Sequence, residues 1–342
     1  MRFSIYERGT HIMCGVRRTS RMSNPFSALY EQCNTDNPAD KYASLKNGPT
    51  IVDIEPTGLC NFRCTMCPTG LQALGRPGGM MSLDTFKAVL VRTEPFSSAI
   101  RFIGWGEPLM NPHIIEMIEA AARRGRLTHL NTNGSKIDYK MATRLIDSGL
   151  SSIKFSFQGI DRASYKAMRQ IDFFEGLIAA IRMVYEARGA GVRPFIAAST
   201  TTTDETDAQI EMFKLRMQSI VDDMNVGHTI FEFIDMAAVP PKQRERLEKA
   251  AATQKVTKRH PVPCPEVYDK LTVHWDGAVR ICCNDYSGKT NLGNINTDGM
   301  ASIWRHPTME AYRERLSRKV YDAPLCETCY AYMPTHKKGD AA

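Results

Sequence analysis

The chain has 342 residues, of which 43% are hydrophobic and 24% are charged. Its 44 basic and 37 acidic residues give a formal net charge of +7 at pH 7, a mild excess that suits an anionic ligand but forms no nucleic-acid-binding stripe. No stretch approaches the roughly 18 consecutive apolar residues that a membrane-spanning helix needs. We therefore expect no nucleic-acid or membrane partner, and the composition predicts a cytoplasmic protein.

The first part of the chain differs in composition from the rest. Residues 1–48 are polar and interrupted by Pro and Gly, so we expect a leader that need not be ordered. From Thr50 onward, apolar runs of strand length alternate with amphipathic runs of helical period. The strand-like runs are 50–56, 99–105, 127–134, 152–159, 193–200 and 225–233, and the helical runs between them are 82–93, 112–125, 139–149 and 173–189. This alternation predicts an α/β fold, a partial (β/α)6 barrel of the TIM type that falls short of eight units.

The C-terminal part is predicted to form a second, smaller unit. Residues 236–262 are charged and contain Pro, which is typical of a connector. The strand-like runs on either side of Asp276-Gly277 predict a β-hairpin, because Asp-Gly favours the tight turn that a hairpin needs. We therefore expect a core barrel over 49–255, a small α+β domain over 256–335 and a tail over 336–342.

The placement of the ten cysteines indicates metal ligands rather than disulfides. Eight of them fall within 60–67 and 264–329, while Cys14 and Cys33 stand apart with no visible chemistry. Disulfide frameworks are typical of small secreted domains, and this chain is long and shows no apolar signal segment. Clustered cysteines in such a chain favour metal sites.

Cys60, Cys64 and Cys67 have the spacing C-x3-C-x2-C and come directly after the first predicted strand. We expect them on a loop at the carboxyl end of that strand, where barrel folds carry their chemistry. Three thiolates can hold three irons of a [4Fe–4S] cube and leave the fourth iron without a protein ligand. A zinc site is the alternative, but structural zinc usually has four protein ligands, and no fourth Cys or His lies nearby in the sequence.

This motif at the start of a series of βα units resembles the radical S-adenosylmethionine (SAM) superfamily. The resemblance implies that Cys60, Cys64 and Cys67 hold the catalytic cluster and that SAM binds its open iron. Gly104-Trp105-Gly106-Glu107 resembles the family's Gly-Gly-Glu segment, with Trp105 where glycine is common. The other implied SAM-binding residues are Met66, Asn133, Ser156 and Arg169. A turn serine and a solvated arginine are the alternatives for the last two.

Cys264, Cys282, Cys326 and Cys329 form a second set with the spacing C-x17-C-x43-C-x2-C. A four-cysteine zinc site is the alternative here, although its upstream half is not the usual Cys-x-x-Cys pair. The region resembles the twitch domain, a shortened SPASM domain of some radical SAM enzymes, which implies one auxiliary [4Fe–4S] cluster. Cys283 is expected to point away from Cys282, because adjacent strand residues face opposite sides. It is either a small buried hydrophobe or, as in radical epimerases, a hydrogen-atom donor.

The resemblance implies a radical SAM oxidoreductase or epimerase with SAM and two [4Fe–4S] clusters as cofactors. Such an enzyme takes an electron from an external donor such as flavodoxin or ferredoxin, cleaves SAM to a 5′-deoxyadenosyl radical and abstracts hydrogen from its substrate. Similarity to the aminocyclitol dehydrogenase type favours a small polar substrate, a sugar or an aminocyclitol, that is oxidised or epimerised with help from the auxiliary cluster. The alternatives are maturation of a ribosomally made peptide and, from another class, a non-catalytic electron-transfer protein.

Overall fold

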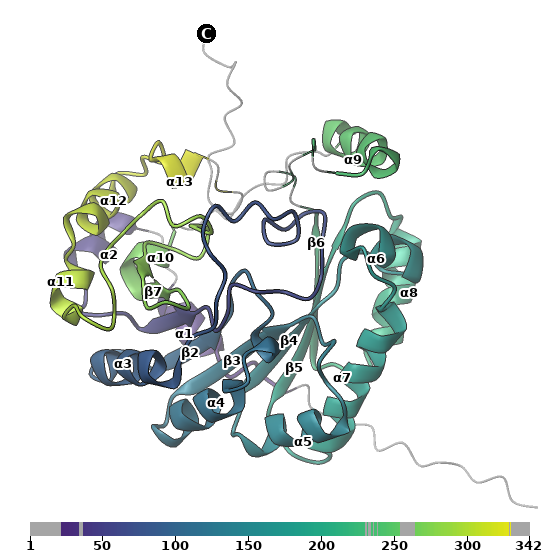
Figure 1. Cartoon of the computed structure of the whole chain (residues 1–342), viewed down its shortest axis with the longest axis horizontal. Coiled ribbons are helices and arrows are strands. Elements are labelled where there is room, and N and C mark those ends of the chain that lie inside the picture. The colour runs from purple at the N-terminus through teal and green to yellow at the C-terminus, as the bar shows by residue number, and fades with distance from the viewer. Residues whose placement is uncertain are drawn as a thin grey trace, which may run out of the picture.

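The computed structural model describes residues 22–33, 37–229, 231, 234, 236, 237, 239–253, 264–327 and 329. Within these residues an eight-stranded sheet has the order β6-β5-β4-β3-β2-β1-β7-β8 (Figure 1). The strands are β1 (Ile51–Ile54), β2 (Ala99–Phe102), β3 (Leu127–Thr132), β4 (Ser152–Ser156), β5 (Phe195–Thr202), β6 (Asp223–His228), β7 (Lys270–Val273) and β8 (Val279–Arg280). The first six strands pair in parallel and in chain order, and the sheet does not close. The predicted partial barrel of the α/β class is confirmed.

Helices on the outer side of the strands bury their apolar residues against the outward-facing side chains of the sheet. The outward apolar positions include Ile54, Phe102 and Phe155, which belong to the main core. Side-chain caps begin several of these helices, as where Ser82 accepts from the Thr85 N–H at 3.1 Å. The elements are α3 (Leu83–Thr93), η1 (Pro108–Met110), α4 (Ile114–Arg123), α5 (Tyr139–Asp147), α6 (Arg162–Arg169), α7 (Phe174–Arg188) and α8 (Asp207–Met217).

Part of the expected leader is ordered and packs against the sheet. Residues 22–48 contain α1 (Ser27–Cys33) and α2 (Pro38–Ala43), whereas residues 1–21, including Cys14, lie outside the described part. Phe26 and Cys33 are buried against Ile51 and Ala99, the first residues of β1 and β2. The segment contains few apolar residues, and these few pack at the amino ends of the strands, so the sequence gives only a weak signal of order.

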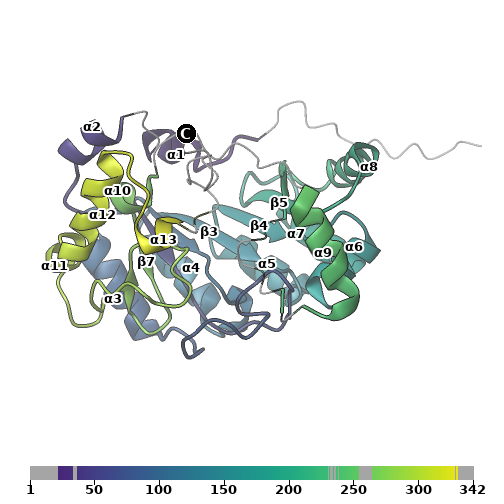
Figure 2. The same ribbon diagram turned by 90° about the horizontal axis from the view of Figure 1, so that it is seen from above.

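The C-terminal region continues the sheet of the core. Strand β7 pairs in parallel with β1, matching Lys270 to Ile51, and β8 returns antiparallel to β7. The predicted hairpin is present, and its Gly277 has a φ of +85°, which favours glycine. Figures 1 and 2 show α12 beside α2. The helices are α10 (Glu266–Asp269), α11 (Met300–Trp304), α12 (Pro307–Ser317) and α13 (Pro324–Glu327). The expected domain boundary near 255 falls within residues 254–263, which lie outside the described part.

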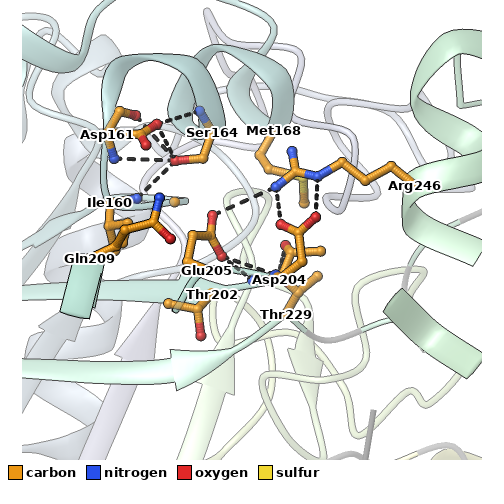
Figure 3. Close-up of polar contacts among 12 residues, drawn as sticks. Ile160, Asp161, Ser164, Met168, Thr202, Asp204, Glu205, Gln209, Thr229 and Arg246 are labelled. Carbon is orange, nitrogen blue, oxygen red and sulfur yellow. Dashed lines mark hydrogen bonds and ion pairs between the residues drawn. The ribbon is translucent and has the colours of Figure 1, made fainter. Parts of the chain in front are cut away.

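The connector contains α9 (Pro241–Thr253), which docks near the carboxyl ends of the strands. Figure 3 shows Arg246 reaching from α9 to the carboxylates of Asp204 and Glu205. The Arg246 Nε donates to Asp204 Oδ2 at 2.9 Å. On the same helix, Leu247 belongs to a small apolar cluster with Met168, against which Met66 of the cysteine loop also packs. The connector thus covers part of the loop that carries the first cysteine set.

Replacing Phe26 by Ala is expected to lower the free energy of unfolding by about 3 kcal/mol, because it leaves a cavity under β1 and β2. Chemical denaturation followed by circular dichroism measures the change. Tyr139→Ala is the matched control, since the Tyr139 side chain is 65% exposed whereas Phe26 is 1% exposed. Equal destabilisation by the two substitutions would show that the packing of Phe26 does not support the sheet.

Candidate active site

Cys60, Cys64 and Cys67 lie on the loop between β1 and α3, at the carboxyl end of β1. The loop is anchored to α6 by the Thr65 N–H, which donates to the Met168 carbonyl oxygen at 2.9 Å. Cys64 is buried and the other two thiols are half-buried. Burial, together with the charges of Glu107 and of the two neighbouring thiols, raises the pKa of Cys60 to about 11. Three thiolates brought together in this way are stabilised by a cationic metal centre.

The two cysteine sets are wider than a site for one metal ion. Among the described residues, one group of three or more Cys, His, Asp or Glu has ligand atoms within 4.8 Å of one another, and it is Asp53, Glu266 and Cys283. Four sulfurs around one zinc lie about 3.8 Å apart, because Zn–S bonds are about 2.3 Å long and tetrahedral. In the described part of the chain, no three sulfurs of either cysteine set lie within 4.8 Å of one another.

Two side chains from later βα units reach the sulfurs of the first set. Arg169 on α6 donates from Nη1 to Cys64 Sγ at 3.4 Å, and Asn133 after β3 donates from Nδ2 to Cys60 Sγ at 3.9 Å. The solvated alternative for Arg169 is wrong, because the residue is only 9% exposed. Its Nε is buried with no hydrogen-bond partner among the described residues. A buried donor left unpaired beside the cysteine loop fits an anionic ligand such as a carboxylate.

The segment Gly104-Trp105-Gly106-Glu107 comes after β2 and packs directly on the cysteine loop. A Cβ added to Gly106 would lie 2.1 Å from the Thr57 carbonyl oxygen, so only glycine allows this approach. Gly104 has a φ of +150°, and a Cβ there would lie 2.8 Å from the Glu55 Cγ. The glycines therefore bring the backbone of this segment against the loop that carries the thiols.

Glu107 is buried, and its carboxylate makes its hydrogen bonds within the protein. It accepts from Thr132 Oγ1 and from the Asn133 N–H, each at 2.7 Å, and from the Leu109 N–H at 3.1 Å. Burial raises the pKa of Glu107, an effect that these hydrogen bonds oppose. The side chain connects the end of β2 to the end of β3.

Ser156 and Met66, the remaining residues expected to contact SAM, lie on either side of Arg169. Ser156 ends β4 and is half-buried, and its carbonyl oxygen accepts from the Arg169 guanidinium. Met66 is half-buried and packs against the apolar cluster beneath α9. Both residues therefore lie close to the elements that carry the first cysteine set.

The second cysteine set lines one cavity of about 710 Å³ on the inner side of the sheet. The sequence prediction that these four residues come together is matched by their positions: Cys264 precedes α10, Cys282 comes after β8, and Cys326 and Cys329 lie in and after α13. The Cys329 N–H donates to the Cys326 carbonyl oxygen at 3.1 Å, which turns the chain between the two. All four thiols are half-buried.

Cys283 lines the same cavity as Cys282, and its Sγ lies within 4.8 Å of ligand atoms of Asp53 and Glu266. Strand β8 ends at Arg280, so both cysteines lie in a turn where the alternation of strand side chains does not apply. Burial raises the pKa of Cys283 to about 12, so its thiol is protonated near pH 7. The Trp105 Nε1–H donates to the Cys283 carbonyl oxygen at 2.9 Å, which connects this turn to the segment after β2.

The inner faces of the strands carry polar residues that sequence reasoning missed. Arg101, His129, Asn131 and Lys154 line the cavity from β2, β3 and β4. The polar residues at every second position of these strands could have revealed them, because in a barrel every second side chain of a strand points inward. The cavity wall is therefore largely polar and charged.

Comparison with known proteins agrees with this arrangement. Residues 54–215 match the family model of the radical SAM superfamily, and residues 264–330 match SPASM, an iron–sulfur cluster-binding domain. The chain is 31% identical over 322 residues to the tungsten-containing aldehyde ferredoxin oxidoreductase cofactor-modifying protein of Pyrococcus furiosus, an alignment that covers 81% of this chain and 86% of that protein. The chain belongs to the radical SAM superfamily.

Other members and structures are more distant. Fe-coproporphyrin III synthase of Methanosarcina barkeri is 20% identical, covering 80% of this chain and 81% of that protein. The crystal structure of Streptococcus suis SuiB bound to S-adenosylmethionine matches with a TM-score of 0.62 and 15% identity, over 85% of this chain and 74% of that chain. This likeness shows the shared fold alone.

As a radical SAM enzyme with a SPASM domain, the protein uses SAM and carries two iron–sulfur clusters, which confirms the cofactors predicted from sequence. Reduced clusters of this kind need an external electron source. None of the described helices combines the length and the apolar character that a membrane span requires.

Gly106→Ala is expected to displace the cysteine loop, because the new methyl group would overlap the Thr57 carbonyl oxygen. The reconstituted variant should lose the first cluster, about four irons per chain, and with it SAM cleavage. Iron analysis and the yield of 5′-deoxyadenosine measure both effects. Gly227→Ala is the matched control, since a Cβ at Gly227 meets no atom closer than 3.9 Å. Full iron content in Gly106→Ala would contradict the tight approach.

Proposed function

We propose that this radical SAM enzyme oxidises a small polar molecule held in the inner cavity that its C-terminal cysteines help to line. The observation that carries the proposal is the cavity of about 710 Å³, whose wall includes both inner strand residues and the C-terminal cysteines. Two cysteine sets would hold the clusters: the SAM-binding one on Cys60, Cys64 and Cys67, and the auxiliary one on Cys264, Cys282, Cys326 and Cys329.

The size and lining of the cavity support a small-molecule substrate. Its volume lies within the roughly 300–1,000 Å³ that is typical of small-molecule sites. Polar residues such as Asn131 and Asn225 can hydrogen-bond the hydroxyl or amino groups of a sugar or aminocyclitol. The relative from Pyrococcus furiosus is named for modifying a cofactor, which is also a small molecule.

The residues around the first cysteine set would bind SAM. The unpaired Nε of Arg169 suits the methionine carboxylate, and the close backbone of Gly104–Glu107 would meet the amino group. Asn133 and Ser156 end neighbouring strands and would contact the polar part of SAM. Met66 would pack against the adenine.

When bound together, SAM and the first cluster supply a 5′-deoxyadenosyl radical that removes a hydrogen atom from a substrate carbon. Reduced flavodoxin or ferredoxin would provide the electron for SAM cleavage. Cys264, Cys282, Cys326 and Cys329 would hold the auxiliary cluster, which would supply a one-electron acceptor; with loss of a proton from the substrate radical, the substrate would lose two electrons in all. The cavity wall would hold the substrate and exclude water during these steps.

The function is tested with deuterium-labelled candidate sugars and aminocyclitols incubated with SAM, dithionite and the reconstituted enzyme. Oxidation predicts deuterium in 5′-deoxyadenosine and a product two mass units lighter than its unlabelled substrate. A product with the mass of the unlabelled substrate, one unit below the deuterated one, and with inverted stereochemistry would indicate epimerisation instead. Turnover only with a peptide would overturn the small-molecule proposal.

Replacing Cys60, Cys64 and Cys67 together by Ala is expected to abolish 5′-deoxyadenosine formation. The iron content should fall from about eight to about four per chain, because only the auxiliary cube remains. Cys33→Ala is the control, since Cys33 is buried at the opposite end of β1. SAM cleavage that survives the triple substitution would show that other residues hold the catalytic cluster.

Replacing Cys326 and Cys329 by Ala is expected to remove about four irons while SAM cleavage without substrate continues. Substrate oxidation should fall to background, because the substrate radical then lacks its electron acceptor. Comparison of product with 5′-deoxyadenosine yield measures this uncoupling. Undiminished oxidation in this variant would show that the auxiliary site supports the fold and carries no electron.

A further inference from the structure

The inner cavity is lined by three cationic side chains among the described residues, and two of them have carboxylate partners. Arg101 on β2 donates from Nε and Nη2 to the two carboxylate oxygens of Asp53, each at 2.5 Å. Lys270 on β7 forms an ion pair with Glu266. Lys154 on β4 lines the same cavity but makes no hydrogen bond or ion pair with any described residue. One positive charge is therefore unmatched.

The register of the sheet determines what surrounds Lys154. Its cross-strand neighbours are Asn131 on β3 and Ala197 on β5, and the short side chain of Ala197 leaves space beside the ammonium group. The Asn131 Oδ1 is hydrogen-bonded to His129 Nε2 at 2.8 Å, which leaves the Asn131 amide NH₂ as a donor. Asp223 also lines the cavity, but it is exposed and lies two strands away, with its Cα about 10 Å from the Lys154 Cα by the usual strand spacing.

The local electrostatics also indicate an excess of positive charge. Burial and the charge of Arg101 lower the pKa of Lys154. Burial, Lys154 and Arg101 lower the pKa of His129 to about 3, so His129 is neutral near pH 7. His129 is held in place by Ser152 Oγ, at 2.6 Å from its Nδ1. A half-buried ammonium without a carboxylate partner is stabilised when an anion binds beside it.

We infer that Lys154 binds an anionic group of the substrate, a phosphate or a carboxylate, with the Asn131 amide as a second donor. The inference rests on the proposed function, because it assigns the cavity to the substrate, and it narrows that substrate to a phosphorylated or carboxylated molecule, since an unsubstituted sugar or aminocyclitol carries no anionic group. Lys154 lies two residues before Ser156, the last residue of β4. The anionic end of the substrate would therefore lie deep in the barrel, and its reacting carbon would point toward the carboxyl ends of the strands, where the first cysteine set lies.

The test uses the full-length protein reconstituted with both clusters and saturated with SAM, so that the SAM site is filled. Inorganic phosphate and acetate are titrated separately by isothermal titration calorimetry. We expect saturable binding of one of them to the wild type, weakened about tenfold or more in Lys154→Met, because a charge-assisted hydrogen bond is lost. Lys154→Arg should retain most of the affinity. Lys140→Met removes an exposed lysine on α5 and should bind as the wild type does.

The preferred anion distinguishes a phosphorylated substrate from a carboxylate substrate. Equal affinity of Lys154→Met and the wild type, or no binding of either anion to the wild type, would overturn the inference. Lys154→Gln replaces the Met variant should the latter fail to reach the wild-type iron content. SAM cleavage by the wild type is measured in the same preparations, so a failure of the radical chemistry is seen separately from a failure of anion binding.

Discussion

The buried carboxylate of Glu107 holds the carboxyl ends of the central strands together. It bridges the segment after β2 to Thr132 and Asn133 at the end of β3, with both hydrogen bonds at 2.7 Å. Asn133 in turn reaches Cys60 Sγ, so the carboxylate and the first cysteine set are separated by one residue. A buried carboxylate is retained only where hydrogen bonds compensate its lost hydration. This set of contacts positions the cysteine loop, the glycine segment and the end of β3 relative to one another.

The two faces of the sheet differ in polarity and in what they contact. The outer face carries apolar residues such as Ile54 and Phe155, which pack on the surrounding helices and stabilise the fold. The inner face carries Arg101, His129 and Lys154, whose polar groups contribute little to apolar burial. Parallel strands buried on both faces are usually apolar throughout. In this chain the polar inner face lines the cavity, which suits the polar substrate that we propose.

The pairing of β7 with β1 relates the two cysteine sets. Because Ile51 is matched to Lys270, the hairpin and the turn with Cys282 are extensions of the same sheet that carries the first cysteine loop. Trp105 adds a direct contact by donating to the Cys283 carbonyl oxygen. A shared sheet holds both sites at a constant separation, with the cavity along its inner side. Such rigidity favours a reaction in which a substrate is acted on from two sides.

Local patterns in the sequence were enough to predict the class of chemistry and the type of fold. The C-x3-C-x2-C spacing and the alternation of strand-like and helical runs are such patterns, since a few neighbouring residues decide them. The placement of Cys282 and Cys283 in one turn was decided by where β8 ends, so the alternation expected along a longer strand does not apply to them. The order of the segment around Phe26 depends on contacts with β1 and β2, which a short polar stretch does not reveal.

The folded chain alone shows that Asp53 and Glu266 neutralise Arg101 and Lys270 but that Lys154 has no ion-pair partner among the described residues. Charge balance inside a barrel depends on which distant residues become cross-strand neighbours, and packing alone decides that.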